Sequence, residues 1–404
     1  METGPMGRNA RRIASAAVAA AILTTWAGLR STRADGPRLE ITGSGAREDA
    51  SHHDEYLVGV YYFAGWWRDQ PNKWQRGGRD WRADWPQRVP TLGEYNEQAT
   101  MDREIVAAAD HGVDFFQILY YCRPALVNGR SPEPHADKLN AALEQFMASP
   151  HAGRMKFTLE TVNHPPFDAT TDQEWAEACH LWAQAMKHPS YLRVDGRPVF
   201  KIHGYELFLR SAGGDVETAR ARLDVLRQAV RDAGAGEVML SAGILPEQLF
   251  PGELPNEFDF LTTYMWMPGG GRVASDSEDS PRNAPLRPYA ELIDYAEAGW
   301  KIQNDKGPRF YVPYVPAGWD PRPWQDPRCS YAMPTRVEWI DALQRVKRAL
   351  DTSPRLGAPK KDGSRAKMLL IYAWNEFGEG GIVAPTRGEG MMKLEAIREV
   401  FGRR

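Results

Sequence analysis

The stretch "KMLLIYAWNEFGEGG", residues 367–381, joins an apolar run to a glycine-rich loop that carries two glutamates. Between Met368 and Trp374 the run contains no charged residue, which is typical of a strand covered on both of its faces. Similar apolar or β-branched runs occupy 56–63, 113–121, 155–162, 198–203, 237–242, 258–264 and 309–315. The chain therefore contains eight predicted strands.

Helical patterns fill the intervals between these strands. One example is 100–112, where Met101, Ile105 and Ala108 fall on one stripe. The other predicted helices cover 137–148, 172–187, 216–234, 289–301, 336–350 and 393–401. Regular alternation of strands and helices predicts an α/β fold, a single (β/α)₈ TIM barrel with long βα loops. An open doubly wound sheet is the alternative, but no G-x-G-x-x-G follows the first strand.

The N-terminus has the pattern of a secretory signal peptide. Three arginines within 8–12 precede an uncharged run over 13–29, and the small residues Thr32 and Ala34 then stand in the positions of a cleavage site. The arginine pair at 11–12 is consistent with twin-arginine export, so we expect a secreted or periplasmic protein. An uncleaved anchor is the alternative, although the run is short and alanine-rich for a stable span. The expected organisation is a signal peptide over 1–34, a flexible linker over 35–55 and one domain over 56–404.

Composition and short motifs exclude several function classes. The net charge of −3 gives no general attraction to nucleic acid. The sequence contains no H-E-x-x-H, no P-loop, no G-x-S-x-G and no D-x-D, and we expect neither a metal nor an organic cofactor. Cys122, Cys179 and Cys329 form no C-x-x-C pair, and we interpret them as buried thiols.

Aromatic residues gather where the first predicted strand ends. The loop over 64–96 contains five tryptophans, and an ordered loop of this kind over a barrel mouth would form a stacking wall for a flat ligand. A satellite hydrophobic cluster is the alternative.

The other strand ends carry aromatic, acidic and histidine residues. In a barrel these positions meet at the catalytic face, so they predict a pocket for a polyhydroxylated ligand. The expected aromatic contacts are Tyr62, Trp66, Trp67, Tyr121, Trp266, Trp319 and Trp374, and the expected polar contacts are Glu160, His203, Asp320 and Asn375.

Glu376 and Glu379 stand three residues apart just after the eighth strand. A glycosidic bond is cleaved by two carboxyl groups, one donating a proton and the other acting as base or nucleophile. Such a pair needs unlike surroundings, so that one group stays protonated while the other ionises. The alternative is an acidic loop in which Glu376 pairs with Arg387.

The segment "YAWNEFGEGGIVAPT" (372–386) resembles the W-N-E-W-G-E-G signature of glycoside hydrolase family 99-like proteins, also called WbsX-like glycosyltransferases. The resemblance extends over about 56–390. It also includes "GVYYFAGWW" (59–67), "PTLGEYN" (90–96), "HGVDFFQILYY" (111–121), "HPSYLRVDGRPVFKIH" (188–203) and "VPAGWDPRPW" (315–324). Two positions depart from the pattern: Phe377 replaces Trp, and Gly378 stands where the hydrolases have His.

The resemblance implies a (β/α)₈ barrel that acts on glycans, with α-mannan as the model substrate and a retaining two-glutamate mechanism. It implies that Glu376 is the base toward the sugar 2-hydroxyl, through an anhydro-sugar intermediate, and that Glu379 is the general acid and then base. We therefore expect a secreted glycoside hydrolase acting on a polysaccharide or oligosaccharide, with no nucleic-acid partner and no membrane span after signal cleavage. A glycosyltransferase of polysaccharide assembly and a non-catalytic glycan-binding protein are the alternatives.

Overall fold

The computed structural model describes residues 55–69, 72–122, 138–250, 254–271 and 285–402. Asp54–Arg404 form one compact unit, and the description below concerns that unit. The predicted signal peptide and all but the last residue of the predicted linker lie outside the described residues, so both stay predictions.

The described residues contain a ring of parallel strands at the positions that the sequence predicts. Buried apolar side chains run along most of each strand, as expected for strands packed on both faces. The strands are β1 (Tyr56–Tyr62), β4 (Phe115–Tyr121), β5 (Lys156–Val162), β7 (Arg197–Ile202), β8 (Met239–Gly243), β9 (Phe260–Thr262), β10 (Phe310–Val312) with β11 (Tyr314–Pro316), and β13 (Arg365–Tyr372).

The ring closes at the seventh strand position, which Pro313 divides into β10 and β11. β10 pairs with β9, whereas β11 pairs with β13, and β13 pairs in turn with β1. Proline has no N–H, but its carbonyl still accepts a hydrogen bond from Leu370 N at 3.0 Å. The open-sheet alternative is therefore wrong, and the TIM-barrel prediction is confirmed.

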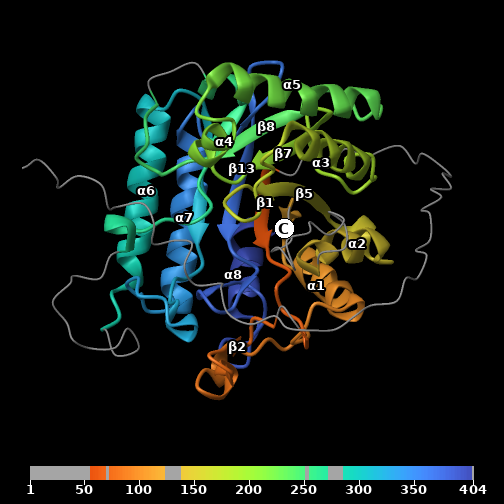
Figure 1. Ribbon diagram of the computed structural model, residues 1–404. Helices are drawn as coiled ribbons and strands as arrows, with labels where there is room; N and C mark the ends of the chain where they lie inside the picture. The colour runs from red at the N-terminus through yellow and green to blue at the C-terminus, as the bar shows by residue number, and fades with distance from the viewer. Residues whose placement is uncertain (1–54, 70–71, 123–137, 251–253, 272–284, 403–404) are drawn as a thin grey trace, which may run out of the picture. The chain divides into compact units, whose positions relative to one another are not determined.

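Helices surround the strand ring (Figure 1). They are α1 (Gln98–Asp110), α2 (Ala141–Ala148), α3 (Asp172–Ala185), α4 (Tyr205–Ser211), α5 (Val216–Asp232), α6 (Tyr289–Lys306), α7 (Arg336–Thr352) and α8 (Met392–Phe401). Capping boxes begin α3 at Thr171 and α7 at Thr335. In each, the threonine side chain accepts from the backbone N–H of the glutamate three residues later, and that glutamate's side chain accepts from the threonine N–H. The short helix α4 has no counterpart among the predicted helices.

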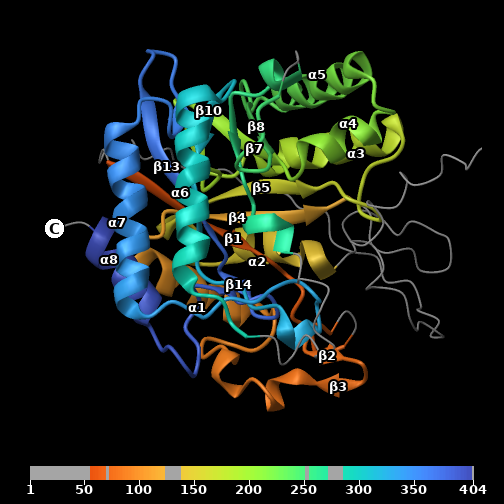
Figure 2. The same cartoon turned by 90° about the vertical axis from the view of Figure 1, so that its left-hand side faces the viewer.

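The loops contain short strands and 3₁₀ turns. The β2–β3 hairpin lies in the long loop after β1 and forms the lower edge of the molecule in Figures 1 and 2. These elements are β2 (Gln75–Arg76), β3 (Arg79–Asp80), β6 (Arg193–Val194), β12 (Ala358–Pro359), β14 (Asn375–Glu376) and β15 (Gly381–Ile382), with the 3₁₀ turns η1 (Trp81–Ala83), η2 (Pro86–Arg88), η3 (Lys138–Asn140), η4 (Ala152–Arg154), η5 (Leu254–Glu257), η6 (Pro268–Gly271) and η8 (Arg322–Trp324).

The core has one layer inside the ring and another between the ring and the helices. Tyr61 and Tyr62 on β1 show the division: Tyr61 contacts Lys201 of β7, whereas Tyr62 donates to Glu104 of α1. Cys122 and Cys179 are buried as expected, but Cys329 is only half-buried. None of the helices in the described ranges has the length and apolar content that a membrane crossing requires.

Candidate active site

The two glutamates lie on one tight turn that follows β13. Glu379 N and Gly380 N both donate to the carbonyl oxygen of Glu376, at 3.0 and 2.8 Å. Gly380 has a φ of 89°, and a Cβ there would lie 2.6 Å from Asp320 N. Glycine is therefore required for the turn. Because the turn follows the carboxyl end of a barrel strand, both glutamates lie at the face where barrel enzymes do chemistry.

The surroundings of the two carboxyl groups differ. Tyr264 Oη donates to Glu376 Oε1 at 2.8 Å, and Tyr372 Oη donates to Glu379 Oε2. Glu376 is 5% exposed and has no ion pair with any described residue. Glu379 is more exposed, with Arg328 Nη2 at 3.7 Å from its Oε1. The alternative of an ion pair between Glu376 and Arg387 is wrong, because Arg387 pairs with Glu94 at 3.1 Å.

These surroundings place a proton on one member of the pair. Burial, and then the charge of Glu379, raise the pKa of Glu376 to about 8. Burial also raises the pKa of Glu379, but Arg328 and Tyr372 oppose that rise. At neutral pH the ligand-free protein therefore holds Glu376 protonated and Glu379 as the more readily ionised group.

A buried charge network lies beside the pair. The strand register sets Glu160 of β5 next to Lys201 of β7, and the Lys201 Nζ to Glu160 Oε1 distance is 2.9 Å. His203 Nδ1 lies 2.6 Å from the same oxygen, and its ring centroid is 4.9 Å from that of Tyr264. Although burial opposes ionisation, Lys201 and His203 hold the pKa of Glu160 below its usual value.

This network revises one predicted contact. Glu160 is fully buried and its two oxygens accept from Gln117, Lys201 and His203, so it has no surface to offer a sugar. Its role is to position His203, whose side chain is 20% exposed. His203 remains a predicted ligand contact, next to the tyrosine that bonds Glu376.

Three aromatic residues predicted to line the pocket lie in the core instead. Tyr62 faces α1, Trp374 packs on Phe116, and Trp66 is enclosed by Trp74 and Phe377. Each of the three predicted side chains is at most 1% exposed. Much of the long loop after β1 therefore forms a hydrophobic cluster packed on the core, which was the alternative to an aromatic wall that stacks on a ligand.

Three further predicted contacts hold the loops together. Asn375 Oδ1 accepts from Phe63 N at 2.8 Å, and its Nδ2 donates to Phe63 O at 2.7 Å. Asp320 is paired with Arg88 and Arg322. Trp319 is 1% exposed and donates to the carbonyl of Cys329 at 3.1 Å. Their polar groups are already bonded, so none of the three is placed to bind a sugar directly.

The remaining aromatic predictions have different degrees of exposure. Trp67 and Trp266 are half-buried, so part of each residue is exposed. Tyr121 is 6% exposed and packs edge-on against Phe167. These three stay predicted contacts.

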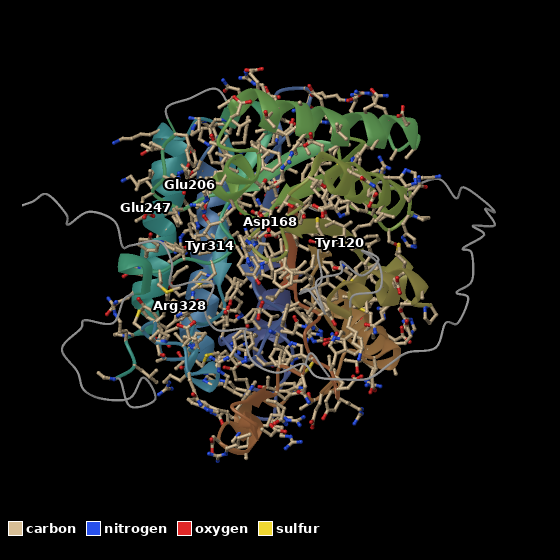
Figure 3. All side chains as sticks on the ribbon, in the orientation of Figure 1. Tyr120, Asp168, Glu206, Glu247, Tyr314 and Arg328 are labelled. Atoms are coloured by element: carbon tan, nitrogen blue, oxygen red, sulfur yellow. The ribbon has the colours of Figure 1, made fainter. Side chains whose placement is uncertain are left out.

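The structure adds site residues that the sequence prediction omitted. Tyr264 and Tyr372 bond the two glutamates, and Arg328 lies against Glu379. In Figure 3, Arg328 is labelled on the side of the barrel where α6 and α7 lie, with Tyr120 of β4 on the other side. Tyr372 lies within the segment 367–381, but nothing in the sequence indicated that its hydroxyl reaches a residue seven positions later.

Gly378 has a packing partner that explains its small size. A Cβ at this position would lie 2.1 Å from two atoms of the Trp324 indole. Trp324, on the turn η8, therefore occupies the space beside the carboxylate turn that a side chain at position 378 would need. Within the described residues no group of three or more His, Cys, Asp or Glu side chains is arranged to hold a metal ion.

Comparisons with known proteins agree with this architecture. A GH99 endo-α-mannosidase from Bacteroides thetaiotaomicron matches 86% of this chain and 98% of its own at 14% identity, with a TM-score of 0.52. At this identity the likeness shows the fold alone. The uncharacterized protein WxcX from two strains of Xanthomonas campestris pv. campestris is 26% identical over 242 residues, which is 58% of this chain. The match spans 31% of the WxcX protein, so this chain covers about a third of that relative.

The family assignment rests on a match to a family model. The model of the family described as glycosyltransferase WbsX matches residues 167–397, more than half of the chain, and this range contains both glutamates and their tyrosine partners. The motifs quoted from the first two strands lie outside the matched range. The chain belongs to the WbsX glycosyltransferase family, a family of carbohydrate-active enzymes.

Proposed function

We propose that the protein is a glycoside hydrolase that cleaves bonds in a polysaccharide or oligosaccharide through Glu376 and Glu379. The observation that supports this most is the pair itself. Two largely buried carboxyl groups lie on one turn at the barrel mouth, each bonded by a different tyrosine and only one beside an arginine. Unlike surroundings of this kind let one carboxyl donate a proton while the other acts as base or nucleophile.

The electrostatics and the family resemblance assign the roles of proton donor and base to opposite members of the glutamate pair. The ligand-free surroundings favour Glu376 as the proton donor, because its pKa is raised to about 8 by burial and by Glu379. The resemblance implies the opposite order, with Glu379 as acid and Glu376 as base in a retaining mechanism. Both orders use the same pair, so the proposal of hydrolysis does not depend on which is correct.

A glycosyltransferase is the second candidate, and the name of the matching family favours it. Such an enzyme needs an activated sugar donor, which is mostly cytoplasmic. The predicted signal peptide argues against that location, and we propose that the protein is exported. The missing D-x-D motif also argues against a metal-dependent sugar-nucleotide transferase.

The test is a screen of the purified protein against α-mannans and a panel of other polysaccharides, with release of reducing ends as the readout. Glu376→Gln and Glu379→Gln are assayed beside the wild type, after thermal unfolding has shown that both are folded. Sugar release that both variants lose supports the proposal. Equal release by the variants contradicts the catalytic assignment, and consumption of a nucleotide-sugar without hydrolysis favours the transferase.

A further inference from the structure

Lys73 lies close to the carboxylate turn but is not bonded to it. Its Nζ is 5.8 Å from the centroid of the Trp324 ring, and that indole fills the space beside Gly378. Gly378 stands between the two glutamates in the chain. The Lys73 charge lowers the pKa of both Glu376 and Glu379 against the effect of burial, which agrees with a position near both groups.

Lys73 differs from the other enclosed lysines in having no partner. Lys201 pairs with Glu160 at 2.9 Å, and Lys393 pairs with Glu389 at 2.9 Å and donates to a carbonyl at 2.8 Å. Lys73 is half-buried, and its ammonium has neither a hydrogen bond nor an ion pair with any of the described residues. Withdrawing a charge from water without a partner is costly, and a bound anion would remove that cost.

Two other cations, Arg328 and Arg76, act in the same surroundings as Lys73. Arg328 lies 3.7 Å from Glu379 and is held by Asp326 at 2.7 Å. Arg76 acts electrostatically on both Lys73 and Asp326. Arg76 and Arg328 thus both act on Asp326, whereas Lys73 has no acidic partner among the described residues.

We infer that the site takes a sugar bearing an anionic substituent, and that Lys73 contacts this substituent. The substituent is a carboxylate, sulfate or phosphate, since each accepts charged hydrogen bonds from an ammonium. The inference rests on the proposed carbohydrate function and adds the substrate class to it. A lysine that only adjusted the glutamates would be expected to pair with one of them directly, as Lys201 does with Glu160.

The test is binding of the full chain to oligosaccharides arranged in matched pairs. Each pair contains a uronate-bearing, sulfated or phosphorylated oligosaccharide and the same compound after carboxyl reduction, desulfation or dephosphorylation. The wild type should prefer the anionic member of at least one pair by about tenfold or more, the size expected of one charged hydrogen bond. The class of pair that shows the preference identifies the substituent.

Variants of Lys73 decide whether this residue carries the preference. Lys73→Met should abolish the preference, whereas Lys73→Arg, which keeps the charge, should retain most of it. Lys301→Met removes an exposed lysine from α6 and should change nothing. A wild type without any anionic preference, or a Lys73→Met variant that keeps it, overturns the inference. Binding does not require turnover, so a protein that prefers anionic glycans but cleaves none would contradict only the hydrolase proposal.

Discussion

Replacing Glu376 by glutamine should abolish activity and yet stabilise the fold, increasingly so as the pH rises. In the unfolded chain this carboxyl has a pKa near 4.5, whereas burial and Glu379 raise the pKa to about 8 in the folded protein. Between these values the folded state holds a proton that the unfolded state releases. The contribution of protonated Glu376 to the free energy of unfolding is therefore fully present below pH 4.5, and it is lost as the pH rises through 8.

The size of the effect follows from the two pKa values. The loss is about 3 kcal/mol at pH 7, about 5 kcal/mol at pH 9 and below about 1 kcal/mol at pH 5. Glutamine keeps an oxygen for Tyr264 and never ionises, so Glu376→Gln avoids the loss. For a domain of this size the unfolding entropy is about 0.7 kcal/mol per degree, which makes the expected gain in melting temperature roughly 4 °C at pH 7 and 7 °C at pH 9.

The assay is calorimetric unfolding of the wild type and Glu376→Gln from pH 5 to pH 9. Glu177→Gln, an exposed substitution on α3, serves as the control and should follow the wild type at every pH. A difference between Glu376→Gln and the wild type that does not grow with pH would refute the argument that burial keeps Glu376 neutral.

Three further outcomes are expected. An aryl glycoside with a good leaving group should restore cleavage to the variant that lacks the general acid. The pKa order of the two glutamates predicts that Glu376→Gln is the rescued variant. Rescue of Glu379→Gln alone would support the order that the resemblance implies. Gly378→Ala should cost about 1–3 kcal/mol of unfolding free energy in urea by overpacking against Trp324, and adding Trp324→Ala should recover part of it. Lys201→Met should cost about 3–5 kcal/mol in the same assay, because it leaves its buried glutamate partner without a counterion, and an unchanged midpoint would contradict that pairing.

The barrel was predictable because several strands are apolar along their length and most intervals between strands have helical spacing. The helix α4 was missed because its seven residues are too few for a periodic pattern to appear. Closure at Pro313 was also beyond the sequence pattern. A proline within a strand indicates an edge or an interruption, and here the two halves of the interrupted strand pair with different neighbours.

The candidate site was predicted less well than the fold, for a physical reason that β1 illustrates. Successive side chains of a strand point to opposite faces, so one member of the Tyr61–Tyr62 pair must face the barrel interior. Because both residues are tyrosine, the pattern could not show which. The structure assigns the interior to Tyr61, the residue not chosen. Asn375 was misassigned for a related reason, since its type predicts hydrogen bonding but not that the backbone of Phe63 satisfies it.

Gly378 connects these findings to the chemistry. When the motif is considered alone, glycine in place of histidine at this position indicates only that the motif has lost a side chain. In the structure the vacated space holds Trp324, which comes from the loop after β11. The same loop supplies Arg328 to Glu379, and the centroid of its Trp324 ring lies 5.8 Å from Lys73 Nζ. The surroundings of the two glutamates are therefore set largely by a loop some fifty residues upstream of the motif. Family members that share the W-N-E motif but differ in this loop should differ in substrate, and exchanging the loop should change specificity more than restoring histidine at position 378, which would first have to displace the indole.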